Sequence, residues 1–257
     1  MNQPRKVTDA RRRRPLPRPQ RWALDVAAPG ELHTWHDPAA RLVAVLRGLA
    51  ELLPREYQQP ITWWTAGDGE APWADADAVT KIMERQRTHD TEDDQPAPGA
   101  RGVVQGWLGE DRDAPLVDVL WSAGVSDRLF SCTVRFNPRG GARSLSRHQP
   151  EWLISLLRTA VESAGATVGR IVTSSWLKED ERRMGWGVPL DRMIPFWLGE
   201  VTYLSRAIDP DTLPDSLIAH PGRHGTVVAL ADLSATVTGR TDVIDEALTL
   251  RPYLATP

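Results

Sequence analysis

The clearest apolar segment of the chain is Phe196-Trp197-Leu198-Gly199-Glu200-Val201-Thr202-Tyr203-Leu204-Ser205. Glycines and prolines flank it, within residues 185–195 and again within 210–214. Beta-branched and aromatic residues between such turn formers are typical of a strand with at least one buried face. Because side chains alternate along a strand, Val201 and Tyr203 share a face, and we expect both in the core.

The length and composition are those of an ordinary globular protein. The chain has 257 residues, of which 41% are hydrophobic and 25% are charged. This length suffices for one large domain or two small ones. No apolar run approaches the roughly 20 residues that cross a bilayer, so we expect no membrane association. The single cysteine, Cys132, excludes an internal disulfide and fits a reducing, cytoplasmic compartment.

The net charge of −3 combines two opposite parts. Residues 1–21 carry eight basic side chains and one acidic one, a charge of +7, which leaves −10 for the other residues. An acidic folded part favours a basic partner over a polyanion.

The basic arm, residues 1–21, has too few apolar side chains to fold and is predicted to be disordered. Arg11-Arg12-Arg13-Arg14 resembles a twin-arginine export signal, but Leu16-Pro17-Arg18-Pro19 stands where such a signal needs an apolar region. The arm is therefore either a solvated leader or a tether for nucleic acid or another anionic surface.

Local patterns predict an α+β fold with a mainly antiparallel sheet of about six to eight strands and about four helices, in a single domain over residues 22–257. The first strand is expected at 31–36, followed by an amphipathic helix with Asp37 as N-cap and Pro38 at its first position, ended by Pro54. Further strands are expected at 61–65, 115–121, 129–136, 167–174, 196–205, 216–220 and 225–231. Further helices are expected from Asp75, from Pro150 to a cap at Gly165, and over 241–250. Residues 88–102 are predicted to be a mobile loop, and 179–183 a charged loop or short turn.

Signatures of catalysis do not occur in the sequence. The pairs His33/His36 and His220/His224 have metal-ligand spacing for a helix, but they fall in expected strands or turns, where these spacings do not converge. Cys132 lies on the apolar side of its strand, where a buried thiol is the ordinary outcome. No phosphate-binding glycine loop, nucleophile elbow or zinc-protease helix is found. We therefore predict no catalytic residue, no metal and no cofactor, in a protein that is not an enzyme.

Acidic residues cluster between Ala66 and Pro115, where twelve acids face five bases. One interpretation is a solvated surface. The other is an acidic surface that docks on a basic protein, because complementary charge raises association rate and selectivity. The candidate contact residues are Asp75, Asp77, Glu92, Asp93, Asp94, Glu110, Asp111 and Asp113. The first two also suit the start of a helix, as cap and dipole partners.

Three segments resemble the C-terminal half of immunity protein family 52: Gly199–Ser205, the Leu213-Pro214 segment, and Gly225-Thr226-Val227-Val228 with its closing helix. The N-terminal half is similar in layout, with a strand bearing Trp35, a leucine-rich helix and the pair Trp63-Trp64. The family comprises bacterial α+β proteins encoded beside polymorphic toxins. The resemblance, over about residues 31–253, implies a non-enzymatic protein that binds and blocks a cognate toxin, often a nuclease of restriction-endonuclease type.

Glu200 departs from the family, which usually has tryptophan after the glycine. A glutamate fits the predicted strand if it is exposed at an edge or on an open sheet face, whereas burial without a partner would contradict the strand. The alternative function is a nucleic-acid-associated protein that uses Arg11–Arg14. It predicts DNA affinity that falls steeply with salt and is lost when residues 1–21 are deleted.

Overall fold

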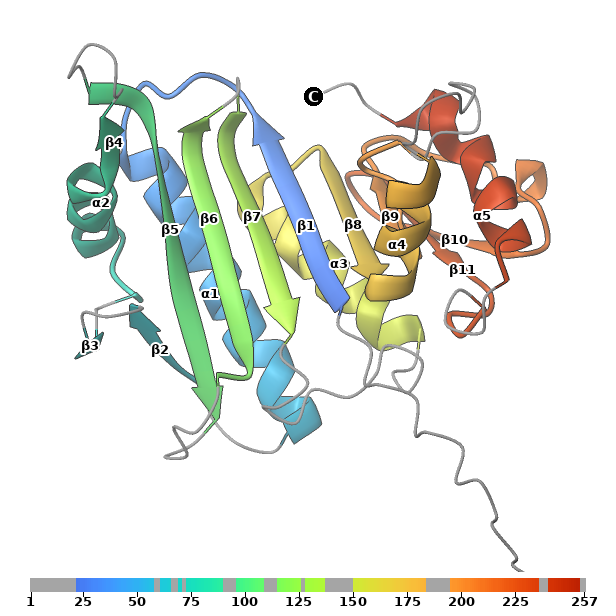
Figure 1. Ribbon diagram of the computed structural model, residues 1–257, viewed down its shortest axis with the longest axis horizontal. Helices are drawn as coiled ribbons and strands as arrows, with labels where there is room; N and C mark the ends of the chain where they lie inside the picture. The colour runs from blue at the N-terminus through green and yellow to red at the C-terminus, as the bar shows by residue number, and fades with distance from the viewer. Residues whose placement is uncertain are drawn as a thin grey trace, which may run out of the picture.

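The computed structural model describes residues 22–57, 61–65, 69–70, 73–89, 96–108, 115–125, 128–136, 150–183, 195–235 and 240–254. Within these ranges eleven strands form one sheet in which every pairing is antiparallel (Figure 1). They are β1 (Trp22–Pro29), β2 (Ile61–Thr65), β3 (Gly69–Glu70), β4 (Arg87–His89), β5 (Pro96–Leu108), β6 (Val117–Val125), β7 (Arg128–Phe136), β8 (Val168–Thr173), β9 (Val201–Leu204), β10 (Leu217–Pro221) and β11 (Thr226–Leu230). Their order is β10-β11-β9-β8-β1-β7-β6-β5-β2-β3, and β4 also pairs with β5. The α+β prediction is confirmed, with more strands than expected.

Two long helices cover one face of this sheet. Helices α1 (His36–Tyr57) and α3 (Pro150–Ala164) lie side by side behind the strands in Figure 1. Between them and the sheet lies the main core, where Trp22 of β1 stacks on Phe136 of β7 with 3.6 Å between ring centroids. The predicted cap ends α3, since Gly165 has a φ of +57° and the next amide donates back to the Val161 carbonyl.

Among the described residues, the opposite face is covered only at one end. There α4 (Ser174–Arg183) lies over β8 and buries Trp176 completely, and Trp197 packs against Ala27 and Val168. Helix α5 (Asp242–Ala247) is joined to α4 by an ion pair of 2.6 Å between Arg183 and Asp245. At the other end, α2 (Ala76–Arg85) lies beside β4 and β5 at the edge of the sheet (Figure 1). Within the described ranges, no helix is long and apolar enough to cross a membrane.

The N-terminal strand was misplaced in the prediction. Residues 31–36 form no strand, and the structure has β1 at Trp22–Pro29, between β7 and β8. Its alanines have low strand propensity, and both of its faces are largely buried, so the polar alternation of an exposed strand is missing.

Helix α1 differs from the prediction at both ends. The Ala39 amide donates to the Trp35 carbonyl, so the helix begins before Asp37, which lies in its first turn instead of capping it. The helix also continues past Pro54 to Tyr57. A proline in the last turn removes a single backbone hydrogen bond and does not force the helix to end at that residue.

The predicted mobile loop at 88–102 contains strand. Residues 96–102 begin the long strand β5, and 87–89 form β4. Pro96 and Pro98 lie before the pairing with β6, which starts at Ala100, so neither proline is needed as a donor in that ladder. Gly102 lies where a Cβ atom would meet the Trp121 ring at 2.5 Å, so glycine here serves close packing and not flexibility.

The predicted strand at 196–205 is shorter in the structure, because Pro195–Leu198 forms a turn and β9 begins at Val201. Val201 and Tyr203 are buried as expected. Glu200 is fully buried, and its carboxylate accepts hydrogen bonds from the Thr173 amide at 3.1 Å and the Thr173 hydroxyl at 2.5 Å. Neither of the two situations foreseen for Glu200 applies, since it is buried but has partners.

The same contacts explain why residues 174–183 form a helix, which includes the charged loop or short turn predicted at 179–183. The Thr173 hydroxyl accepts from the Trp176 amide in the first turn of α4. Arg182 and Arg183, three and four residues after Glu179 in the helix, both donate hydrogen bonds to the Glu179 carboxylate. The hydrogen bond from Arg182 is the main cause that lowers the pKa of Glu179 to about 2.

Replacing Glu200 with alanine should lower the free energy of unfolding by about 2–3 kcal/mol, because it leaves the buried Thr173 amide without an acceptor. Glu200→Gln keeps a carbonyl oxygen in the same place, so it should lower the free energy of unfolding by less than Glu200→Ala does. Urea unfolding of the three proteins measures the difference. Equal losses in both variants would show that the carboxylate's bonds to Thr173 do not carry the effect.

Candidate functional site

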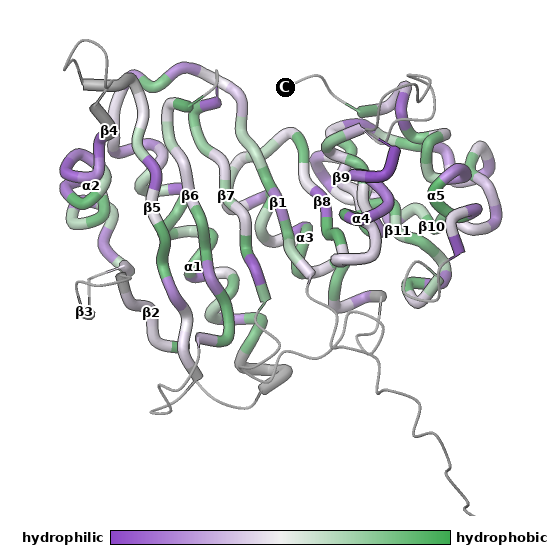
Figure 2. The backbone as a smooth tube through the Cα atoms, viewed as in Figure 1, coloured by the Kyte–Doolittle hydropathy of each residue, from purple (hydrophilic) through white to green (hydrophobic). Residues whose placement is uncertain are grey.

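The face of β5, β6 and β7 that points away from α1 and α3 is half-exposed. Alternate residues of β6, from Val117 to Ala123, are buried, and the residues between them are only partly buried. Figure 2 shows the matching alternation of hydrophobic and hydrophilic positions along these strands. This surface is called the open face below, and its central residues are Arg101, Val103 and Gln105 of β5, Asp118, Leu120 and Ser122 of β6, and Ser131, Thr133 and Arg135 of β7.

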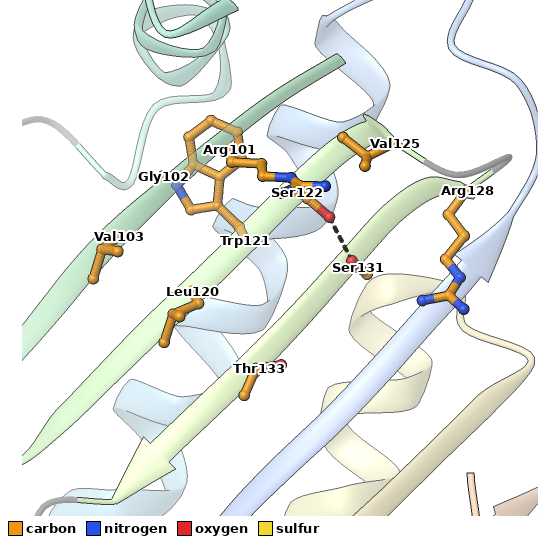
Figure 3. A pocket seen from close by; sticks show the side chains of 10 residues that line it. All are labelled: Arg101, Gly102, Val103, Leu120, Trp121, Ser122, Val125, Arg128, Ser131 and Thr133. Carbon is orange, nitrogen blue, oxygen red and sulfur yellow. Dashed lines mark hydrogen bonds between the residues drawn. The ribbon is translucent and has the colours of Figure 1, made fainter. Parts of the chain in front are cut away.

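Strand register places polar groups opposite one another on this face. Gln105 donates to Asp118 at 2.9 Å, and the hydroxyl oxygens of Ser122 and Ser131 lie 2.6 Å apart. Ser122 and Ser131 have short side chains, and the face is hollowed above them, with a volume of about 510 Å³. The hollow is lined by Arg101, Gly102, Val103, Leu120, Trp121, Ser122, Val125, Arg128, Ser131 and Thr133 (Figure 3).

Two arginines flank the hollow. Figure 3 shows Arg101 of β5 on one side of the Ser122–Ser131 pair and Arg128 of β7 on the other. The guanidinium of Arg128 also lies 5.2 Å from the centre of the Trp197 ring, so this residue borders the covered end of the sheet. The arrangement can bind an anionic group through charge and hydrogen bonds.

The covered end of the same face holds a buried ion pair. Asp25 of β1 and Arg170 of β8 are cross-strand partners, and the Arg170 Nε donates to Asp25 at 2.9 Å. The second oxygen of Asp25 accepts from Thr133, and the Arg170 guanidinium lies 4.3 Å from the centre of the Phe196 ring. With both charges matched, this cluster serves to hold β1, β7 and β8 together.

Asp180 of α4 is buried near this cluster, and within the described residues its Oδ1 atom has no hydrogen-bond partner. Burial raises the pKa of Asp180, although Arg170 opposes the effect. Ionisation of Asp180 is therefore less favourable in the folded protein than in the unfolded chain.

The predicted acidic contact residues are only partly described. Asp75 is the N-cap of α2, with its carboxylate accepting from the Asp77 amide at 2.9 Å, and Asp77 is exposed and lies 3.4 Å from the His36 ring nitrogen. Both lie at the edge of the sheet and not in the hollow. Glu92, Asp93, Asp94, Glu110, Asp111 and Asp113 lie outside the described residues.

The other groups considered from the sequence are placed as follows. Cys132 is buried under the sheet, and burial raises the pKa of its thiol well above the ordinary value. No group of three metal-ligating side chains gathers anywhere in the described ranges. Trp63 packs against the core from the helix side, so Trp64, next to it in β2, lies on the other face.

The sequence analysis missed Arg101 and Arg128. The first fell in the predicted loop at 88–102, and the second lies at the start of β7, one residue before the strand expected at 129–136. Alternation along β5 would have placed Arg101 on the outer face, but only the pairing of β5, β6 and β7 brings both arginines to one hollow. Comparison with known proteins gives no guide to these residues, because no protein-family model and no curated protein matches the chain.

Asp25→Ala should lower the free energy of unfolding by about 3–5 kcal/mol, because it leaves the buried Arg170 guanidinium without its carboxylate. The double variant Asp25→Leu/Arg170→Met removes both charges, so its free energy of unfolding should fall less than that of Asp25→Ala. Urea denaturation of the single and double variants tests this. A double variant as unstable as the single one would contradict a role for the unmatched charge.

Asp180→Asn should raise stability at neutral pH. The folded-state pKa of Asp180 lies above its unfolded value, so wild-type stability falls as pH rises through that window, and the cost remains in full above it. The difference between Asp180→Asn and wild type should shrink below about pH 3.9, the ordinary pKa of aspartate, where both side chains are neutral. Unfolding curves at neutral pH and below about pH 3.9 measure the stability difference between the two proteins. A variant less stable than wild type at neutral pH would refute the prediction.

Proposed function

We propose that the protein is a non-enzymatic immunity protein, which binds a cognate bacterial toxin in the cytoplasm and blocks it. The observation that carries the proposal is the open face of β5, β6 and β7, a broad half-exposed sheet surface with alternating apolar and polar side chains. A rigid surface of this kind suits recognition of another folded protein, since apolar contacts and positioned polar groups together give affinity and specificity.

Support for the toxin as partner comes from the sequence. The segments around Gly199–Ser205 and Gly225–Val228 resemble immunity protein family 52, and they correspond to β9 and β11, which pair with each other. In the family such proteins act by binding. The partner we propose is a nuclease toxin, as the resemblance implies.

Charge supports the same partner. A nuclease cleft is shaped for phosphate and is therefore cationic, and residues 22–257 carry a net charge of −10. The acidic residues between Ala66 and Pro115 are the proposed source of this attraction. Attraction between opposite charges raises the association rate of two proteins, and this effect weakens as ionic strength rises.

Co-expression tests the function directly. The chain should restore growth of cells that express the toxin domain encoded by the neighbouring gene, and the two purified proteins should form a complex. Growth arrest that persists when the chain is expressed in soluble form would refute the proposal.

Charge reversal tests the acidic segment. Replacing Glu92, Asp93 and Asp94 with lysine should weaken the complex, because it removes attraction to a basic partner and adds repulsion. The control replaces three acids far from this segment in the sequence, namely Asp211 and Asp215, which precede β10, and Glu246 of α5. Protection and affinity equal to those of the control would exclude the segment from the interface.

A further inference from the structure

The hollow on the open face is positive, in a chain whose net charge is −3. Among the described residues that line it are two arginines, Arg101 and Arg128, and no acidic residue. Across the described ranges neither arginine has a carboxylate within salt-bridge distance, whereas Arg170 on the same face is paired with Asp25. No described carboxylate therefore neutralises the two guanidinium groups, and an anion supplied from outside can pair with them.

Hydroxyl groups between the arginines complete a set of donors. Ser122 and Ser131 share one hydrogen bond of 2.6 Å, which uses one of their two hydroxyl protons and leaves the other free to donate. Both side chains are partly exposed and lie between the guanidinium groups in Figure 3. Guanidinium and hydroxyl donors around one hollow match the acceptor oxygens of a carboxylate.

We propose that this hollow receives a carboxylate-bearing segment of a partner protein, with Arg101 and Arg128 as its charged anchors. The identity of that partner as the toxin rests on the proposed function. A nuclease holds its divalent metal through carboxylates, so a toxin of that class presents acidic side chains at the site that an inhibitor must cover.

The lining favours a peptide over a nucleic acid. Val103, Leu120 and Val125 give the hollow apolar walls, which suit the aliphatic part of a glutamate and its neighbours. Sites for single-stranded nucleic acid combine a cationic track with exposed aromatic rings on which bases stack. Among the described lining residues the only aromatic side chain is that of Trp121, which is 2% exposed and cannot stack on a base.

The test titrates the ¹⁵N-labelled full chain with a peptide of about six glutamates at about 0.15 M salt, where long-range attraction is screened. Amide shifts should concentrate at Arg101, Ser122, Arg128 and Ser131 and saturate. In the variant Arg101→Glu/Arg128→Glu the affinity should fall at least about tenfold, since two charge-assisted contacts become repulsive. The matched control, Arg47→Glu/Arg223→Glu, changes the same charge outside the hollow and should bind as wild type.

Three results would overturn the inference: no saturable shift, shifts that the Arg101→Glu/Arg128→Glu variant retains, or tighter binding of a thymidine oligonucleotide at the same residues. The peptide titration does not involve the toxin, so it can fail while co-expression still protects cells. Conversely, peptide binding at the hollow without protection would refute the immunity function and leave the carboxylate site standing.

Discussion

Burial of charge is the constraint on which the C-terminal part of the structure depends. Asp25, Arg170 and Glu200 all lie in the covered half of the sheet and are almost inaccessible to water. A charge in that position is tolerated only if a counter-charge or hydrogen-bond donors replace the lost hydration. Arg170 meets Asp25 between β8 and β1, and Glu200 accepts from Thr173, whose hydroxyl also caps α4. These contacts tie the end of β8, the start of α4 and the approach to β9 into one unit.

The covered unit leaves the remainder of the same sheet face half-exposed. Every residue of β8, β9 and β11 is buried, whereas β6 alternates between buried and partly buried residues. Trp197 and Arg128 mark the border between these halves. One half of the face therefore stabilises the fold, and the other half leaves side chains accessible on a rigid support, which is the surface proposed above for a partner.

Regular alternation made β7 and the long helices predictable from sequence, since one buried face imposes a clear period. Failures arose where tertiary contacts override local signals. Strand β1 is buried on both faces and rich in alanine, and β5 contains prolines and glycines whose roles depend on its neighbours. Helix α4 depends on a cap from Thr173 that is visible only once β8 is placed. The candidate site was not predictable for a related reason, because it is assembled by the pairing of three strands.

The acidic surplus and the cationic hollow act at different ranges and are compatible in one interface. A surplus of −10 over residues 22–257 acts on an approaching protein as a whole, although salt limits its reach to about 8 Å under physiological conditions. In the proposed interface the arginines of the hollow act only at contact, where excluded water strengthens their pairing with a matched carboxylate. A purely acidic surface would attract every basic protein alike. A hollow of opposite charge adds selectivity, because a partner without carboxylates at the matching place would bury Arg101 and Arg128 unpaired, at a high cost in free energy.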